Sequence, residues 1–200
     1  VLLIAHMDTV HKSPVTDLCK SQTGIWMSPQ GIGGDDRCGI YAILKIIEKV
    51  KCSVLFTEDE ETGCQGARKF CNSRITPTVN YIVEIDRKGR DDSVFYRCDN
   101  KEFTEFVNSF GFKTASGTCS DISSIAPHLK TAAVNLSSGY YNPHTEHEYI
   151  VLADLWLTVN RVIKMVSTDS KKYEFIEEKV KSYYEDYSGG NYNFSYFDDD

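Results

Sequence analysis

The segment VLLIAHMD (residues 1–8) decides the fold, because an uninterrupted apolar run ends directly in polar side chains. The first five residues, VLLIA, contain no polar member. Such a run is typical of a strand buried on both faces, as in a parallel sheet that is covered by helices. His6 and Asp8 follow, so this strand brings an imidazole and a carboxylate to its carboxyl end.

Strands and helices alternate through most of the chain that follows. Residues 37–50 carry apolar side chains at helical spacing, and Asp35 or Asp36 is placed to cap the N-terminus of that helix. The other predicted helices are 65–72, 101–110 and 152–167. The other predicted strands are 24–28, 53–57, 79–85, 93–97 and 131–136. This alternation predicts an α/β fold, a three-layer α/β/α sandwich with a mainly parallel, mixed sheet.

The composition is that of an ordinary globular protein of 200 residues, enough for one domain with a sizeable core. The net charge of -7 argues against nucleic acid or an anionic membrane as a partner. The seven cysteines show no spacing typical of a zinc ribbon or a CxxC pair, so we expect reduced thiols and a cytoplasmic location. No run is long enough to span a membrane, and no signal peptide is recognisable.

The expected domain covers residues 1–187. Residues 188–200, SGGNYNFSYFDDD, are expected to be a flexible acidic tail rich in tyrosine. Because the sequence begins inside a core strand and without a methionine, we expect that the N-terminal part of a longer parent is missing.

Histidines and carboxylates follow five of the predicted strands. The segments are HMD (6–8), GIGGDDRCG (31–39), Glu58–Glu61, Asp86, and SSGYYNPHTEHE (137–148). Each alone has an ordinary structural explanation: a histidine that packs, a helix cap, a solvated acidic loop, or the start of a turn. Ligands bind beyond the carboxyl ends of the strands in open α/β sheets, so the set together indicates a metal site. A divalent cation would also offset the repulsion among the clustered acids.

The order and approximate spacing of five motifs resemble those of the co-catalytic di-zinc exopeptidases. The motifs are HMD (6–8), GGDDRCG (33–39), DEETG (59–63), EID (84–86) and PHTEHE (143–148). This superfamily comprises aminopeptidases, tripeptidases and glutamate-type carboxypeptidases with a shared α/β/α catalytic domain. Each motif alone is weakly specific, whereas all five in order are highly specific. The resemblance covers about residues 1–168 and implies that residues 1–187 hold a zinc peptidase catalytic domain.

The resemblance also implies a branch of the superfamily. Two-domain members insert a lid or dimerisation domain before the last metal ligand, and the interval from Asp86 to His144 is too short for one. This chain therefore resembles the single-domain, aminopeptidase-like branch. Its oligomeric state is left open.

Two zinc ions per chain are implied by the resemblance, with cobalt or manganese as other metals that such a site could take. Asp35 would bridge the two ions, and the Asp35–Asp36 peptide is expected to be cis. The implied ligands are His6, Asp35, Glu61, Asp86 and His144.

The implied mechanism is hydrolysis of a peptide bond by a metal-bridging hydroxide, with Glu60 as the general base. Asp8 would hydrogen-bond the second ring nitrogen of His6 and fix its tautomer. Tyr141 is our candidate for a donor to the oxyanion, with His147 as the alternative, and a structural role is equally compatible with both.

Two further residues have both a functional and a structural explanation. Asp121, in GTCSD (117–121), is expected near the site, in contact with a substrate amine, unless Ser120 or Asp121 simply caps the helix that follows. His11 lies in a polar loop after the first motif and is either a substrate contact or a loop residue.

Three functions are compatible with this sequence. A di-zinc exopeptidase, most simply an aminopeptidase on short peptides, is favoured because the ligand set and Glu60 are all present. An N-acyl amino acid deacylase would use the same ligands and would differ only in its substrate pocket. A non-enzymatic binding protein on this scaffold would normally lack a ligand or the base, and none is missing here.

Overall fold

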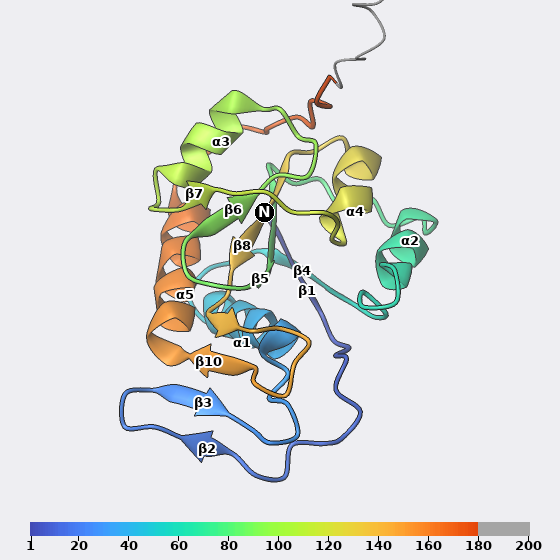
Figure 1. The fold of residues 1–200 in the computed structure, drawn as a ribbon. Coiled ribbons are helices and arrows are strands. Elements are labelled where there is room, and N and C mark those ends of the chain that lie inside the picture. The colour runs from blue at the N-terminus through green and yellow to red at the C-terminus, as the bar shows by residue number, and fades with distance from the viewer. Residues whose placement is uncertain (180–200) are drawn as a thin grey trace, which may run out of the picture.

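A six-stranded sheet forms the centre of the computed structural model, which describes residues 1–179 (Figure 1). The tail expected at 188–200 lies outside the described residues. The strands, in their order across the sheet, are β4 (Ser53–Thr57), β1 (Leu2–His6), β5 (Ile82–Arg87), β8 (Ala133–Ser137), β6 (Asp92–Val94) and β7 (Lys113–Thr114). Neighbouring strands are parallel except β6 and β8, which are antiparallel. The predicted mainly parallel, mixed sheet is confirmed.

Helices cover both faces of this sheet, which confirms the predicted α/β/α layering (Figure 1). On one face lie α1 (Gly34–Ile47), α3 (Lys101–Asn108) and α5 (Leu152–Ser167). On the other face lie α2 (Gln65–Cys71) and α4 (Ile122–Leu129). Within residues 1–179, no helix combines the length and the apolar content that a membrane crossing requires.

The strand β1 supplies both layers of the core. Leu3 and Ala5 belong to the apolar cluster under α1 and α5, whereas Leu2 and Ile4 belong to the cluster under α2 and α4. All four side chains are almost completely buried. A strand that lies between β4 and β5 and has helices on both faces has no solvent side, which explains the absence of polar residues in VLLIA.

A second, antiparallel sheet of short strands lies beside the carboxyl end of the main sheet (Figure 1). Its strands, in order, are β2 (Cys19–Lys20), β3 (Ile25–Met27), β10 (Tyr149–Val151) and β9 (Tyr140–Tyr141). Only β3 was predicted, because strands of two or three residues carry no readable alternation. The pairing of β10 with β3 brings the segment that carries His144 to the loop that precedes α1.

The predicted strand 93–97 is shorter in the structure. β6 ends at Val94, because its pairing with β8 ends at Asn135. Tyr96 and Arg97 then have φ angles of 41° and 63°, which lie outside the extended region that a strand requires. The chain turns here toward α3 instead of continuing the sheet.

Candidate metal centre

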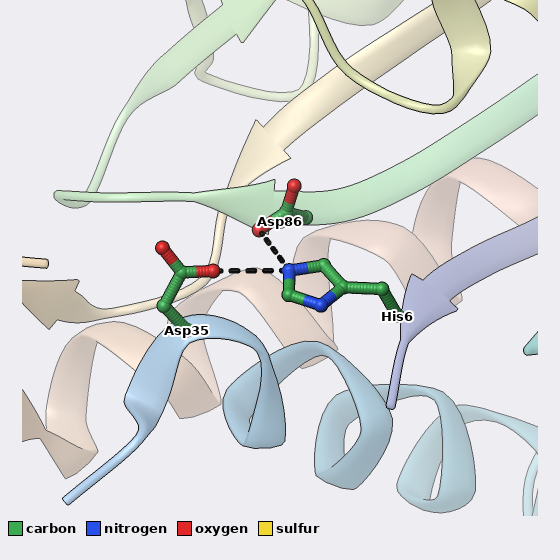
Figure 2. A group of neighbouring side chains, drawn as sticks. All are labelled: His6, Asp35 and Asp86. Carbon is green, nitrogen blue, oxygen red and sulfur yellow. Dashed lines mark hydrogen bonds and ion pairs between the residues drawn. The ribbon is translucent and has the colours of Figure 1, made fainter. Parts of the chain in front are cut away.

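The ends of β1 and β5 and the start of α1 meet at one edge of the main sheet and bring three predicted ligands together. Figure 2 shows the Nε2 atom of His6 facing both carboxylates. It lies 3.1 Å from Oδ1 of Asp35 and 3.5 Å from Oδ1 of Asp86. One ligand atom of each residue lies within 4.8 Å of the other two, so these three residues could hold one metal ion.

Asp35 also belongs to a second group of three. Nε2 of His144 lies 3.2 Å from Oδ2 of Asp35 and 3.1 Å from Oε2 of Glu61. Asp35 therefore faces His6 with one carboxylate oxygen and His144 with the other. All five predicted ligands are thus gathered into two groups that share one residue, as a bridging ligand requires.

The loop that carries Asp35 is tightly packed at the start of α1. The Asp35–Asp36 peptide is cis, as the resemblance implied. Oδ1 of Asp36 accepts a hydrogen bond of 2.9 Å from the backbone N of Gly39, which is the predicted capping contact. A side chain at Gly39 would lie 2.0 Å from the carbonyl oxygen of Ile85, so glycine allows α1 to approach β5 closely.

The hydrogen bonds of the Asp8 carboxylate go to the backbone of the acidic segment at residues 60–61. Its two carboxylate oxygens accept hydrogen bonds of 3.1 Å from the backbone N atoms of Glu60 and Glu61. Nδ1 of His6 lies 3.3 Å from Oδ1 of Asp8 but has no hydrogen-bond partner within residues 1–179. The two groups are in ion-pair contact without a hydrogen bond, so the role of Asp8 in fixing the His6 tautomer stays a prediction.

Glu60 lies beside the two groups without belonging to either. Burial raises the pKa of its carboxyl to about 7, and the positive charge of His6 opposes this rise only in part. Its nearest described polar contact is the thiol of Cys64, 3.7 Å from Oε1. A half-buried carboxyl with a raised pKa, next to a cluster of ligating groups, is a candidate general base.

The carboxylates of the site compete with one another for protons. Burial raises the pKa of Asp86 to about 8, and the charge of Asp35 adds to this rise. Burial would also raise the pKa of Asp35, but its hydrogen bonds to His6 and Asp86, together with the charges of His6 and His144, lower it. Oε1 of Glu61 is buried and has no hydrogen-bond partner among the described residues. These donors, imidazole nitrogen and carboxylate oxygen, are those that bind zinc.

The candidate oxyanion donors lie apart from the ligand groups or at the surface. The hydroxyl of Tyr141 donates to Oδ2 of Asp154 at 2.6 Å, and its ring stacks on Tyr149 with centroids 5.1 Å apart. The Tyr141 hydroxyl thus donates its hydrogen to a carboxylate in the first turn of α5. The role of Tyr141 as a donor to the oxyanion stays a prediction. His147 is exposed, and its role also stays a prediction.

Asp121 is completely buried and accepts a hydrogen bond from Thr57. A carboxylate without exposed surface cannot meet a substrate amine, so the structure does not support that contact. Asp121 occupies the N-cap position of α4, as the structural explanation expected, but its side chain makes no capping hydrogen bond there. The Ser120 hydroxyl donates to Glu84 instead of capping the helix.

Three residues that contact the site were not predicted from the sequence. Asn135 accepts a hydrogen bond of 2.9 Å from the backbone N of Asp86 and donates one of 3.1 Å to its carbonyl oxygen. The hydroxyl of Tyr140 donates to Oδ1 of Asp86 at 3.3 Å. Glu148 accepts from the backbone N of Asp35. The amide within the apolar run TAAVNL was the one visible signal for Asn135.

A site of imidazole and carboxylate groups at the carboxyl edge of a mainly parallel sheet, with a further carboxyl beside it, is typical of a metallohydrolase of the α/β/α class. Residues 1–132 match the model of peptidase family M28. The chain belongs to this family, and it is a metallopeptidase. No curated protein matches this sequence.

Solved structures with the same fold include three peptidases from bacteria. Aminopeptidase PepT from Bacillus cereus ATCC 10987 has a TM-score of 0.69 at 15% identity, over 82% of this chain and 79% of its own. A tripeptidase from Staphylococcus aureus has a TM-score of 0.66 at 15% identity, with the same coverage, 82% and 79%. A Zn-dependent exopeptidase from Parabacteroides distasonis has a TM-score of 0.57 at 15% identity, over 84% and 73% of the two chains. At these identities the likeness establishes the fold.

Proposed function

We propose that this metallopeptidase is a di-zinc exopeptidase, an aminopeptidase that acts on short peptides. The observation that carries the proposal is the sharing of Asp35 by two ligand groups, His6–Asp35–Asp86 and Asp35–Glu61–His144. Membership of family M28 supports a peptidase, and the three structural relatives are described as an aminopeptidase, a tripeptidase and a Zn-dependent exopeptidase.

The residues present fit two zinc ions in number and kind. Each group offers one imidazole and two carboxylates, which leaves each ion a position for water or substrate. Zinc in such a site supplies Lewis-acid polarisation of the peptide carbonyl and acidifies a water molecule. The buried Glu61 oxygen that has no hydrogen-bond partner is the atom that a bound cation would satisfy.

Proton transfer falls to Glu60. Its carboxylate accepts a proton from the attacking water and delivers it to the leaving amine. The two hydrogen bonds that Asp8 makes to the backbone at 60–61 fix this segment, so that Glu60 and its neighbour Glu61 point in different directions for different tasks.

Substrate approaches the site from the side of His144. The His144 side chain is 54% exposed, whereas that of His6 is 1% exposed. The group around His144 is therefore the accessible one, and the group around His6 is enclosed by the sheet and α1. A peptide that arrives from solvent meets the His144 side first.

The proposal is tested by a metal count together with a substrate panel. We expect two zinc ions per folded chain and cleavage of aminoacyl anilides. Cleavage of N-acyl amino acids alone would identify a deacylase. Fewer than about two ions per chain, with no hydrolysis, would identify a binding protein on this scaffold and contradict the two-metal mechanism.

Replacement of Asp8 by alanine is expected to lower kcat/KM by about 10–100-fold. The substitution removes the acceptor of both backbone N–H groups at 60–61, so the base and one ligand lose their common anchor. The measurement is steady-state kinetics with metal content determined on the same sample. Asp17→Ala, in the exposed loop that follows, is the matched control. Activity equal to that of the wild type would show that Asp8 positions neither glutamate.

The metal-free protein is expected to lose stability as the pH rises from about 5 to about 8. Glu60 and Asp86, with pKa values raised to about 7 and about 8, keep protons in the folded state that the unfolded chain releases near pH 4. The pKa of His6 is also raised, because its bonds to Asp35 and Asp86 outweigh burial, so its effect has the same sign. The lowered pKa of Asp35 makes the stability depend on pH only below about pH 3.8, outside the range from about pH 5 to about pH 8.

Urea unfolding of chelator-treated protein at the two pH values measures this effect. Zinc should abolish or reverse the trend, because it binds the deprotonated ligands. A metal-free protein whose unfolding midpoint rises over this range would contradict the arrangement of charges described above.

A further inference from the structure

A completely buried carboxylate, that of Glu148, contacts the loop that carries Asp35. Its exposed fraction is 0%. Oε1 accepts a hydrogen bond of 2.9 Å from the backbone N of Asp35. Oε2 accepts hydrogen bonds of 2.8 Å from the backbone N of Gly33 and 2.8 Å from Nε2 of His11. The Glu148 carboxylate thus accepts three hydrogen bonds, two of them from main-chain N–H groups at the start of α1.

Burial of a carboxylate is costly unless hydrogen bonds replace the lost water. All the hydrogen bonds that the Glu148 side chain makes within residues 1–179 go to this loop and to His11. His11, considered a possible substrate contact from its sequence position, has its Nε2 atom occupied by this carboxylate. The buried carboxylate therefore stabilises this loop and His11.

The loop needs an external acceptor because of its own conformation. Gly33 has a φ of 61°, and Asp35 and Asp36 have non-helical backbone angles. The N–H groups at the start of a helix have no partner within the helix. At Gly34 a side chain would lie 2.7 Å from Cβ of Tyr140, so the loop is also enclosed from the side of β9. Glu148 satisfies donors that otherwise would be buried without partners.

The anchored residue is the one that both ligand groups share. A displacement of the Asp35 main chain moves Oδ1 relative to His6 and Oδ2 relative to His144 at the same time. Glu148 lies four residues after His144 in the same motif, PHTEHE, so one segment supplies a ligand and the anchor of the bridging ligand.

We propose that Glu148 is a positioning residue for both metal positions: its buried carboxylate holds the main chain of Asp35 and so sets the affinity of both groups together. The inference rests on the proposed di-zinc function. Side chains that orient metal ligands typically change metal affinity by about 10–100-fold when they are removed. Removal of the Glu148 carboxylate should weaken the zinc affinity of both positions, although Glu148 itself binds neither ion.

The test is a zinc titration of the full chain against a chromophoric chelator, which resolves the two affinities. Glu148→Gln keeps the size of the side chain but replaces one acceptor oxygen with an NH2 group that cannot accept from the loop. We expect both affinities to fall by about 10–100-fold. Glu146→Gln, an equal change of charge at an exposed position two residues earlier, should titrate like the wild type. His144→Ala should weaken one position and largely spare the other.

The outcomes separate this inference from the proposed function. Wild-type protein that binds no zinc overturns the function itself. Two zinc ions in the wild type and unchanged affinities in folded Glu148→Gln overturn the inference, as does a loss at one position only. A purely structural residue would lower the unfolding temperature of the metal-free protein and leave both affinities unchanged. Should Glu148→Gln not fold, as judged by circular dichroism, Glu148→Asp is titrated instead. That carboxylate is one methylene too short to reach both N–H groups, and the same two criteria apply.

Discussion

Replacement of Glu60 by glutamine should lower kcat by about 10²–10⁴-fold and leave the metal content unchanged. The amide cannot accept the proton of the attacking water, whereas the five candidate ligands are untouched. The enclosed position of Glu60, which raises the pKa of its carboxyl to about 7, also suits it to hold and return a proton near neutral pH.

Steady-state kinetics and elemental analysis of the same preparation measure both effects. Glu58→Gln is the matched control, since Glu58 is an exposed member of the same acidic run. Glu61→Gln is the comparison, because its loss should lower the zinc content together with the activity. Zinc loss in the Glu60 variant, with zinc retained in the Glu61 variant, would show that the two adjacent glutamates have exchanged roles.

Replacement of Asp35 by asparagine should weaken both metal positions at once and abolish measurable turnover. Asp35 contributes one oxygen to each group, and an amide offers a single oxygen with no negative charge. The loss of affinity should exceed the factor of about 10–100 expected for a residue that only orients a ligand.

The zinc titration described for Glu148 measures this effect. Asp17→Asn, the same chemical change at an exposed position, should leave both affinities unchanged. His6→Ala should weaken mainly the group that contains Asp86. An Asp35→Asn protein that keeps one zinc with wild-type affinity would show that Asp35 belongs to one group only.

Long elements with strong patterns could be predicted from the sequence. β1 follows from the run VLLIA, and α1 follows from apolar residues at helical spacing. The carboxyl-edge rule for parallel strands then places His6 and Asp86 at the same edge of the sheet. That they are neighbours there follows from the pairing of β1 with β5, which only the structure shows. Strands such as β2, β9 and β10 could not be predicted, because two or three residues have no period of their own and form only by pairing across the chain.

The contacts that hold the ligands in place were less predictable than the ligands. Asp8 was expected to bind His6 and does lie 3.3 Å from it, but it also binds the backbone at 60–61. That second contact depends on where the segment after β4 turns. Glu148 and Asn135 make their contacts to main-chain atoms. Backbone donors are present at every residue, so no sequence pattern marks the ones that a distant side chain will reach.

The two groups around Asp35 depend on different parts of the chain, residues 6–86 for one and residues 35–144 for the other. His6, Asp35 and Asp86 meet once α1 and β5 pack on β1, whereas His144 and its segment come to the site only after β8, β9 and β10 have formed. Contacts between residues far apart in the sequence form late, because more of the chain must lose conformational entropy before the contact can stabilise it. In a refolding experiment with zinc present, the enclosed position should therefore fill in an early kinetic phase and the accessible position in a later one, with peptidase activity returning only in the second.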